Sequence, residues 1–138
     1  MPNGIDLILA DHERVDTLFT QFNKTGDGVW VGQILDALTA HDGAEHAALY
    51  PFAEVMLKNP ALIKRLDLAH SEVNGLMEHV RGQEGKALVD AMGLLQVAVT
   101  NHVGDEETNL LPALQKRATP AQLETLGARI EQDKQRVG

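Results

Sequence analysis

Apolar residues recur along most of the chain at intervals of three and four positions, which is the spacing of one face of an α-helix. The pattern predicts four long helices, at residues 5–22, 31–52, 60–80 and 88–106. Asn59 has the form of an N-cap for the third of them. Runs of β-branched residues and period-two alternation are weak throughout, so the pattern predicts an all-α fold.

The end of the chain predicts one more helix. Residues 119–122, Thr-Pro-Ala-Gln, have the form of a capping box and would begin a short fifth helix. The apolar face of that helix would consist of Leu123, Leu126 and Ile130. It carries no histidine, so we interpret it as a structural lid across the other helices.

Four helices of similar length joined by short turns predict an up-down-up-down four-helix bundle with an additional short C-terminal helix. We assign residues 1–118 to the bundle and 119–138 to an accessory helix of the same domain.

Polar residues interrupt the apolar face of every long helix. Each face carries one histidine well inside the helix, namely His12, His41, His70 and His102. Glu45 and Glu106 follow the second and fourth of these by one turn, on the same face. Six such side chains in a small core are unfavourable unless something satisfies them. Imidazole and carboxylate together suit iron, manganese or zinc, and this donor set is about right for two ions that share both carboxylates.

A weak internal repeat supports a pseudo-symmetric arrangement of these donors. The segments HDGAE at 41–45 and HVGDE at 102–106 both have the form HxxxE. Pro51 and Pro112 each lie ten residues after the histidine of their segment.

The order of these residues, one histidine in each helix with HxxxE in the second and fourth, resembles the hemerythrin-like, or HHE cation-binding, domain family. The resemblance covers residues 5–115. It implies a four-helix bundle around a non-haem di-iron site, in which two iron ions are joined by an oxo or hydroxo bridge. It also implies ligand roles for six residues, with His12, His41, His70 and His102 as terminal ligands and Glu45 and Glu106 as bridges.

One position departs from the pattern of the oxygen-carrying hemerythrins, which have a fifth histidine one turn after the ligand of the third helix. Here that position is Asn74. Each iron would then have five ligands and an open or water-filled position.

Tyr50 is the candidate for an additional metal ligand at such a position. A phenolate would favour Fe(III), and therefore peroxide chemistry over reversible dioxygen carriage. Against this role, Tyr50 lies roughly 140° from Glu45 around an ideal helix, which favours a packing tyrosine instead. Pro51 could distort the turn before it by removing a hydrogen-bond donor, so both interpretations stay open.

Several other polar residues near these positions have less specific interpretations. We place His46 at the surface or just outside the donor set, since it is adjacent to Glu45 and points elsewhere. Four carboxylates are interpreted as outward charges, namely Glu13, Asp42, Asp105 and Glu107. One of them could orient an imidazole N–H, as residues behind metal ligands commonly do.

Composition narrows the classes of function. The 138 residues and 43% apolar content suit one domain with a real core. The chain has no cysteine, which removes thiolate metal sites, iron–sulfur clusters and thiol catalysis. A net charge of −8 disfavours nucleic-acid binding. No apolar run approaches the roughly 20 residues that span a bilayer, and the start has no basic segment of a signal peptide, so we expect a cytoplasmic protein.

The favoured function is an enzyme-like di-iron centre that reacts with peroxide, nitric oxide or dioxygen in a catalase-like or peroxidase-like manner. The first alternative is a reversible dioxygen or nitric-oxide binding or sensing protein. The second is an iron-binding or structural metal protein. The expected partners are therefore small molecules, and the sequence leaves the substrate, the choice between enzyme and binding protein, and the oligomeric state open.

Overall fold

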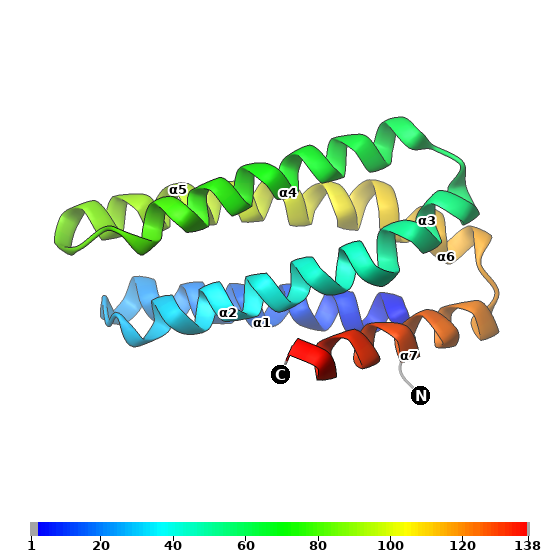
Figure 1. Ribbon diagram of the computed structural model, residues 1–138, viewed down its shortest axis with the longest axis horizontal. Coiled ribbons are helices and arrows are strands. Elements are labelled where there is room, and N and C mark those ends of the chain that lie inside the picture. The colour runs from blue at the N-terminus through cyan, green and yellow to red at the C-terminus, as the bar shows by residue number, and fades with distance from the viewer. Residues whose placement is uncertain (1–2, 138) are drawn as a thin grey trace.

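The computed structural model describes residues 3–137, which form helices joined by short turns (Figure 1). Residues 1, 2 and 138, at the outer limits of the predicted domain assignment, lie outside this range. Four antiparallel rods form the bundle: α1 (Gly4–Thr25); α2 (Val29–Ala44) continued by η1 (Glu45–Leu49) and α3 (Tyr50–Leu57); α4 (Pro60–Arg81); and α5 (Gly85–Asp105) continued by η2 (Glu106–Leu110) and α6 (Leu111–Arg117). The predicted all-α, up-down-up-down bundle is confirmed.

Local capping explains where several helices begin. The Asn59 side chain accepts a hydrogen bond from the Leu62 N–H, and Pro60 is the first residue of α4, as predicted. Thr119 and Gln122 exchange the two bonds of a capping box at the start of α7 (Pro120–Val137). The predicted fifth helix is therefore present, and it is 18 residues long.

Two rods widen by one residue part-way along their length. In the π-helical turns η1 and η2, the N–H of Tyr50 bonds to the Glu45 carbonyl, and the N–H of Leu111 bonds to the Glu106 carbonyl. Pro51 and Pro112 follow directly. A proline inside an α-helix clashes with the carbonyl four residues before it, and a wider turn relieves that clash. The internal repeat in the sequence therefore corresponds to a repeated π-turn.

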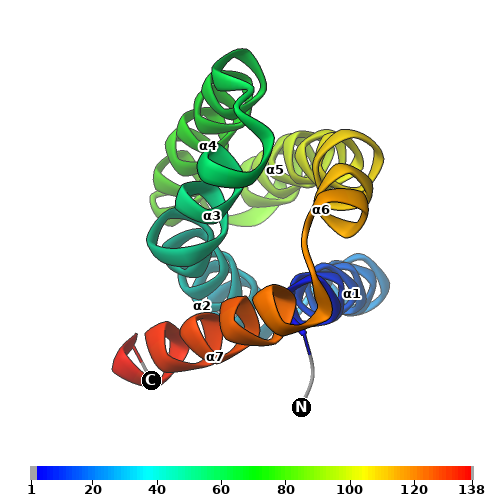
Figure 2. The same cartoon turned by 90° about the vertical axis from the view of Figure 1, so that its right-hand side faces the viewer.

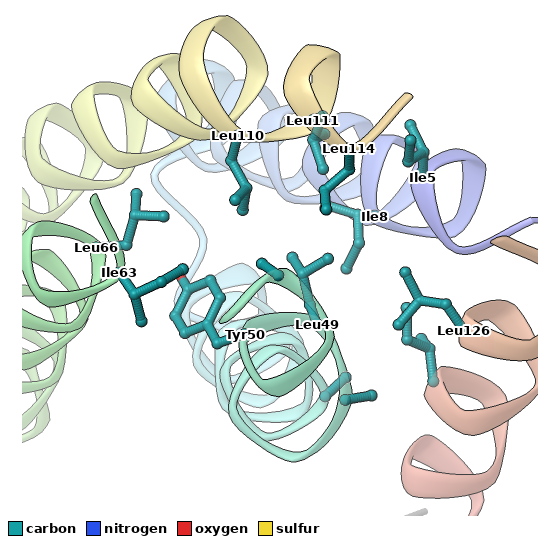
Figure 3. Packing of buried hydrophobic residues seen from close by; sticks show 14 of the residues in the cluster. Ile5, Ile8, Leu49, Tyr50, Ile63, Leu66, Leu110, Leu111, Leu114 and Leu126 are labelled. Carbon is teal, nitrogen blue, oxygen red and sulfur yellow. The ribbon is translucent and has the colours of Figure 1, made fainter. Parts of the chain in front are cut away.

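The core consists of two apolar clusters with a polar layer between them. One cluster lies at the α3, α6 and α7 end and includes Ile8, Leu49 and Leu126 (Figure 3). The other fills the opposite end and includes Phe19 and Ile34. The six predicted donor residues belong to neither cluster and are buried between the two.

Helix α7 lies against α1, α2 and η1 and closes one side of the bundle (Figure 2). Its predicted apolar face, Leu123, Leu126 and Ile130, is buried. A Cβ atom at Gly4 would come within 2.4 Å of the Leu126 side chain, so a glycine is required where α1 meets α7. Among the described residues, no helix is long and apolar enough to cross a membrane.

Candidate metal centre

All six predicted donors point into the middle of the bundle. The four histidines are 4–7% exposed, and Glu45 and Glu106 are 0% exposed. Their donor atoms form two overlapping sets, within each of which the atoms lie within 4.8 Å of one another. The first donor group consists of His12, His41, Glu45 and Glu106. The second donor group consists of Glu45, His70, His102 and Glu106.

Each glutamate presents one oxygen to each group. Glu106 Oε1 lies 3.0 Å from His12 Nε2, while Glu106 Oε2 lies 3.1 Å from His102 Nε2. Glu45 Oε2 lies 3.1 Å from His41 Nε2, while Glu45 Oε1 lies 2.7 Å from His70 Nε2. Two carboxylates that face both groups in this way have the arrangement needed to join two cations.

The π-turn brings Tyr50 into the second group. Its Oη lies 2.8 Å from His70 Nε2 and 3.3 Å from His102 Nε2. The same atom lies 2.6 Å from Glu106 Oε2 and 3.3 Å from Glu45 Oε1. Tyr50 does not lie 140° from Glu45, as it would in an ideal helix, because in a π-turn residue i+5 lies on the same face as residue i. The counterpart of Tyr50 in the repeat is Leu111, so the two groups differ.

Three of the histidines donate Nδ1–H to a carboxylate outside the donor groups. His12 donates to Glu107 at 2.7 Å, His41 donates to Asp11 at 2.9 Å, and His70 donates to Asp42. A ring held through Nδ1 in this way presents Nε2 to the centre, and Nε2 of a neutral imidazole can bind a metal ion.

We expected one of four carboxylates to orient an imidazole, and two of them do so, Asp42 and Glu107. Asp105 instead forms an ion pair with Arg65. Asp11 also orients an imidazole but was not among the predicted carboxylates. Asp11, Asp42 and Glu107 each adjoin a donor residue in sequence but serve a histidine of another helix. That adjacency is the signal that could have identified Asp11.

His46 lies at the rim, as predicted for a residue outside the donor set. Its side chain is half-exposed and bonds to Asp67 at 3.1 Å, with Asp42 3.5 Å from its other nitrogen. Its ring packs edge-on against those of Tyr50 and His70.

The hydrogen bonding inside the cluster is incomplete in a way that fits metal ions. His41 Nε2 and Glu45 Oε2 are buried and 3.1 Å apart, yet neither atom forms a hydrogen bond within residues 3–137. Tyr50 Oη has four polar neighbours but only one hydrogen to donate. Lone pairs that converge without enough hydrogens between them suit cations, and imidazole with carboxylate suits iron, manganese or zinc.

Comparison with known proteins agrees with this donor set. Residues 3–114 match the family model described as Hemerythrin HHE cation binding domain. The chain belongs to this hemerythrin family. The predicted resemblance is thereby confirmed, and the protein is a member of a cation-binding family with a buried histidine and glutamate cluster.

Two relatives extend the comparison beyond the family match. One is a solved hemerythrin HHE cation binding domain-containing protein from Mycobacterium kansasii, which is 22% identical and superposes with a TM-score of 0.82. The superposition covers 99% of this chain and 90% of the M. kansasii chain. That overlap includes α7. The other is a DNA nickase of Nostoc sp. (strain PCC 7120), which is 28% identical over 96% of this chain. This chain spans only 39% of the length of the nickase.

Protons neutralise the hemerythrin-like cluster when no metal is bound. Burial opposes the charged form of His41, but the charge of Glu45 and the bond to Asp11 outweigh it and raise the pKa of His41 to about 10. Burial also opposes charge on His102, but Glu106 and Glu45 raise its pKa to about 9. Metal ions and protons therefore compete for the same nitrogens.

The remaining groups of the cluster titrate in accordance with their surroundings. Burial and the charge of His102 lower the pKa of His70 to about 3. Bonds from His102 and His12 hold the pKa of Glu106 well below its usual range despite burial. Burial, then the charges of Glu45 and Glu106, raise the pKa of Tyr50, which is therefore a neutral phenol in the metal-free protein.

A small cavity adjoins the four histidines of the hemerythrin centre. It has a volume of about 30 Å³, the size of one water molecule, and its apolar lining includes Val15, Val99 and Val103. A groove of about 420 Å³ runs along the surface between α1 and α5 and shares His12 and these three valines with the cavity. The groove and the cavity therefore adjoin the same side chains where α1 and α5 flank the centre.

Proposed function

We propose that this protein binds two iron ions and reacts with peroxide in a catalase-like or peroxidase-like manner. His12 and His41 would hold one ion, and His70 and His102 the other, with Glu45 and Glu106 bridging the two. The two donor groups that share both carboxylates support this assignment. A bound iron pair supplies redox and Lewis-acid chemistry.

One observation favours peroxide as the substrate over reversible dioxygen binding: Tyr50 Oη lies within the second donor group. We propose Tyr50 as an additional ligand, so that the second ion has five protein donors and the first has four. The exchangeable position would then lie at the first ion. A phenolate is a hard anionic donor that stabilises Fe(III), which favours turnover over reversible carriage by Fe(II).

The chain's own residues would control the remaining steps. Asp11, Asp42 and Glu107 fix the rings of three ligands by accepting their Nδ1–H. The small cavity, with a mostly apolar lining, would favour a reacting molecule of only a few atoms. Glu107, which is 40% exposed and bonds to His12, lies in the groove where it can exchange protons with solvent.

The test is oxygen evolution from added hydrogen peroxide by the iron-loaded protein, with Tyr50→Phe as the matched variant. We expect turnover above that of free iron, and a visible tyrosinate-to-iron absorption that Tyr50→Phe removes. An unchanged spectrum in Tyr50→Phe would exclude Tyr50 as a ligand. A rate no higher than that of free iron would exclude the enzyme.

Reversible binding of dioxygen or nitric oxide is the second candidate, and the size of the cavity supports it. It predicts a stable optical change when the reduced protein meets the gas, reversed when the gas is removed. Rapid irreversible oxidation would exclude it. We do not extend DNA cleavage to this chain, because its net charge of −8 opposes contact with phosphates.

A further inference from the structure

We propose that Lys134 of α7 is a positioning residue for the metal centre, acting through Asp11 on His41. This inference rests on the proposed two-ion site. Lys134 Nζ forms an ion pair with Asp11 Oδ1, and Asp11 Oδ2 accepts the His41 Nδ1–H at 2.9 Å. The chain of contacts therefore runs from α7 through α1 to α2 and ends on the first donor group.

The packing of α7 fixes the position from which the lysine reaches Asp11. Leu126 and Ile130 are buried against the bundle, and Lys134 follows Ile130 by one turn on the same face. Gly4 of α1 lies directly against Leu126 of α7, with no room for a Cβ atom between them. Lys134 is thus presented by a rigid element, and its side chain is 30% exposed.

The pairing occupies both oxygens of Asp11. One oxygen is held by the lysine, so the other faces His41 and keeps Nε2 of that ring directed at the first donor group. Within residues 3–137, the orienting carboxylates Glu107 and Asp42 contact histidines and have no lysine or arginine partner. Asp11 differs from them in having a permanent cation that both orients it and offsets its charge.

A role in the metal site extends the function of α7 beyond that of the lid inferred from its sequence. The family match ends at residue 114, before α7 begins. Loss of the lysine should free Asp11 to rotate and weaken the hold of His41 on the first ion, while the second donor group keeps all its contacts.

The experiment compares Lys134→Gln with Lys134→Arg and Arg136→Gln by titrating the metal-free protein with Co²⁺ and reading the visible absorption. Arg136 is exposed on the same helix and serves as the matched loss of charge. We expect two ions in the wild type and a loss of roughly 10-fold in affinity for one of them in Lys134→Gln. Lys134→Arg and Arg136→Gln should keep both affinities.

A second variant and a spectroscopic signature separate positioning from general destabilisation. Asp11→Asn should weaken the same single ion, and adding Lys134→Gln to it should cause no further loss, because the lysine acts through the aspartate. In iron-loaded Lys134→Gln, the Mössbauer signal of one iron should change while that of the other stays.

The outcomes distinguish this inference from the proposed function. Two ions bound with unchanged affinity in Lys134→Gln would overturn the role of Lys134 alone. Equal weakening of both ions, an effect of the same size in Arg136→Gln, or additive losses in the double variant would also overturn it. Fewer than two ions in the wild type would overturn the proposed two-ion function itself.

Discussion

Glu106 and Glu107 are adjacent in sequence but have different surroundings. Glu106 is 0% exposed and faces both donor groups, whereas Glu107 is 40% exposed and its carboxylate pairs with His12. The roles of these two glutamates therefore depend on the atoms that their carboxylates contact and not on the residue type.

This pair gives a direct test of the shared-carboxylate arrangement. Glu106→Gln should weaken the binding of both metal ions, because it removes a charged donor common to both groups. Glu107→Gln should weaken only the first ion, by roughly 10-fold, because it loosens the ring of His12. Isothermal titration of the metal-free variants would measure both effects, and selective loss of one ion in Glu106→Gln would contradict the arrangement.

The pKa values of His41 and His102 predict how the metal-free protein responds to pH. Both are raised, to about 10 and about 9, above the ordinary value of 6.5. A raised pKa stabilises the folded state below the ordinary value, and that contribution is lost as the pH rises through the folded value. The melting temperature of the metal-free protein should therefore fall between about pH 7 and about pH 10.

Metal binding should show the opposite dependence over the same range. The ions displace protons from the imidazoles, so the apparent metal affinity should increase as the pH rises. A melting temperature that stays constant above about pH 7 would show that these imidazoles are not protonated in the metal-free fold.

At the scale of the elements, the periodicity of apolar residues was sufficient to predict the bundle, but it could not predict the π-turns. One extra residue in a turn changes the spacing of the apolar residues at a single point. A pattern in which apolar residues recur every three or four positions is still compatible with that change. The prolines ten residues after His41 and His102 were the only sequence signal. This is why the sequence left the role of Tyr50 open, while the structure places its hydroxyl against four donors.

The groove lined by α1 and α5 predicts where small molecules reach the centre. Val103 lines both the groove and the cavity, whereas Val97 on the same helix is 61% exposed and lines neither. Val103→Phe should slow azide binding to the iron-loaded protein, and an added barrier of about 1.4 kcal/mol would slow it about tenfold. Stopped-flow absorbance would measure the rate, with Val97→Phe as control; equal rates in the two variants would place the route elsewhere.

At the scale of the whole molecule, the six inward donors were predictable because each falls on the apolar face of its own helix and the same pattern recurs from helix to helix. The residues behind them were not, since their contacts join distant parts of the chain. Lys134 and Asp11 are 123 positions apart, and no local pattern relates them. Helix α7 illustrates the same point, because its apolar face was evident from the sequence but its partners were not.

The packing of α7 also makes a prediction for stability. Leu126 is 1% exposed and contacts both α1 and the apolar cluster around Leu49. Leu126→Ala should lower the free energy of unfolding by about 2–5 kcal/mol, as expected for a large core side chain. Denaturant unfolding would measure it against Gln135→Ala, an exposed position of the same helix. A loss below about 1 kcal/mol would mean that α7 contributes little to the fold.

The proposed function depends on two cations held by the two donor groups that share Glu45 and Glu106. Anomalous diffraction at the iron absorption edge, from crystals of protein purified without added metal, tests this most directly. We expect two iron peaks, one beside His12 and His41 and the other beside His70, His102 and Tyr50. A single peak, or none between Glu45 and Glu106, would contradict the proposed function.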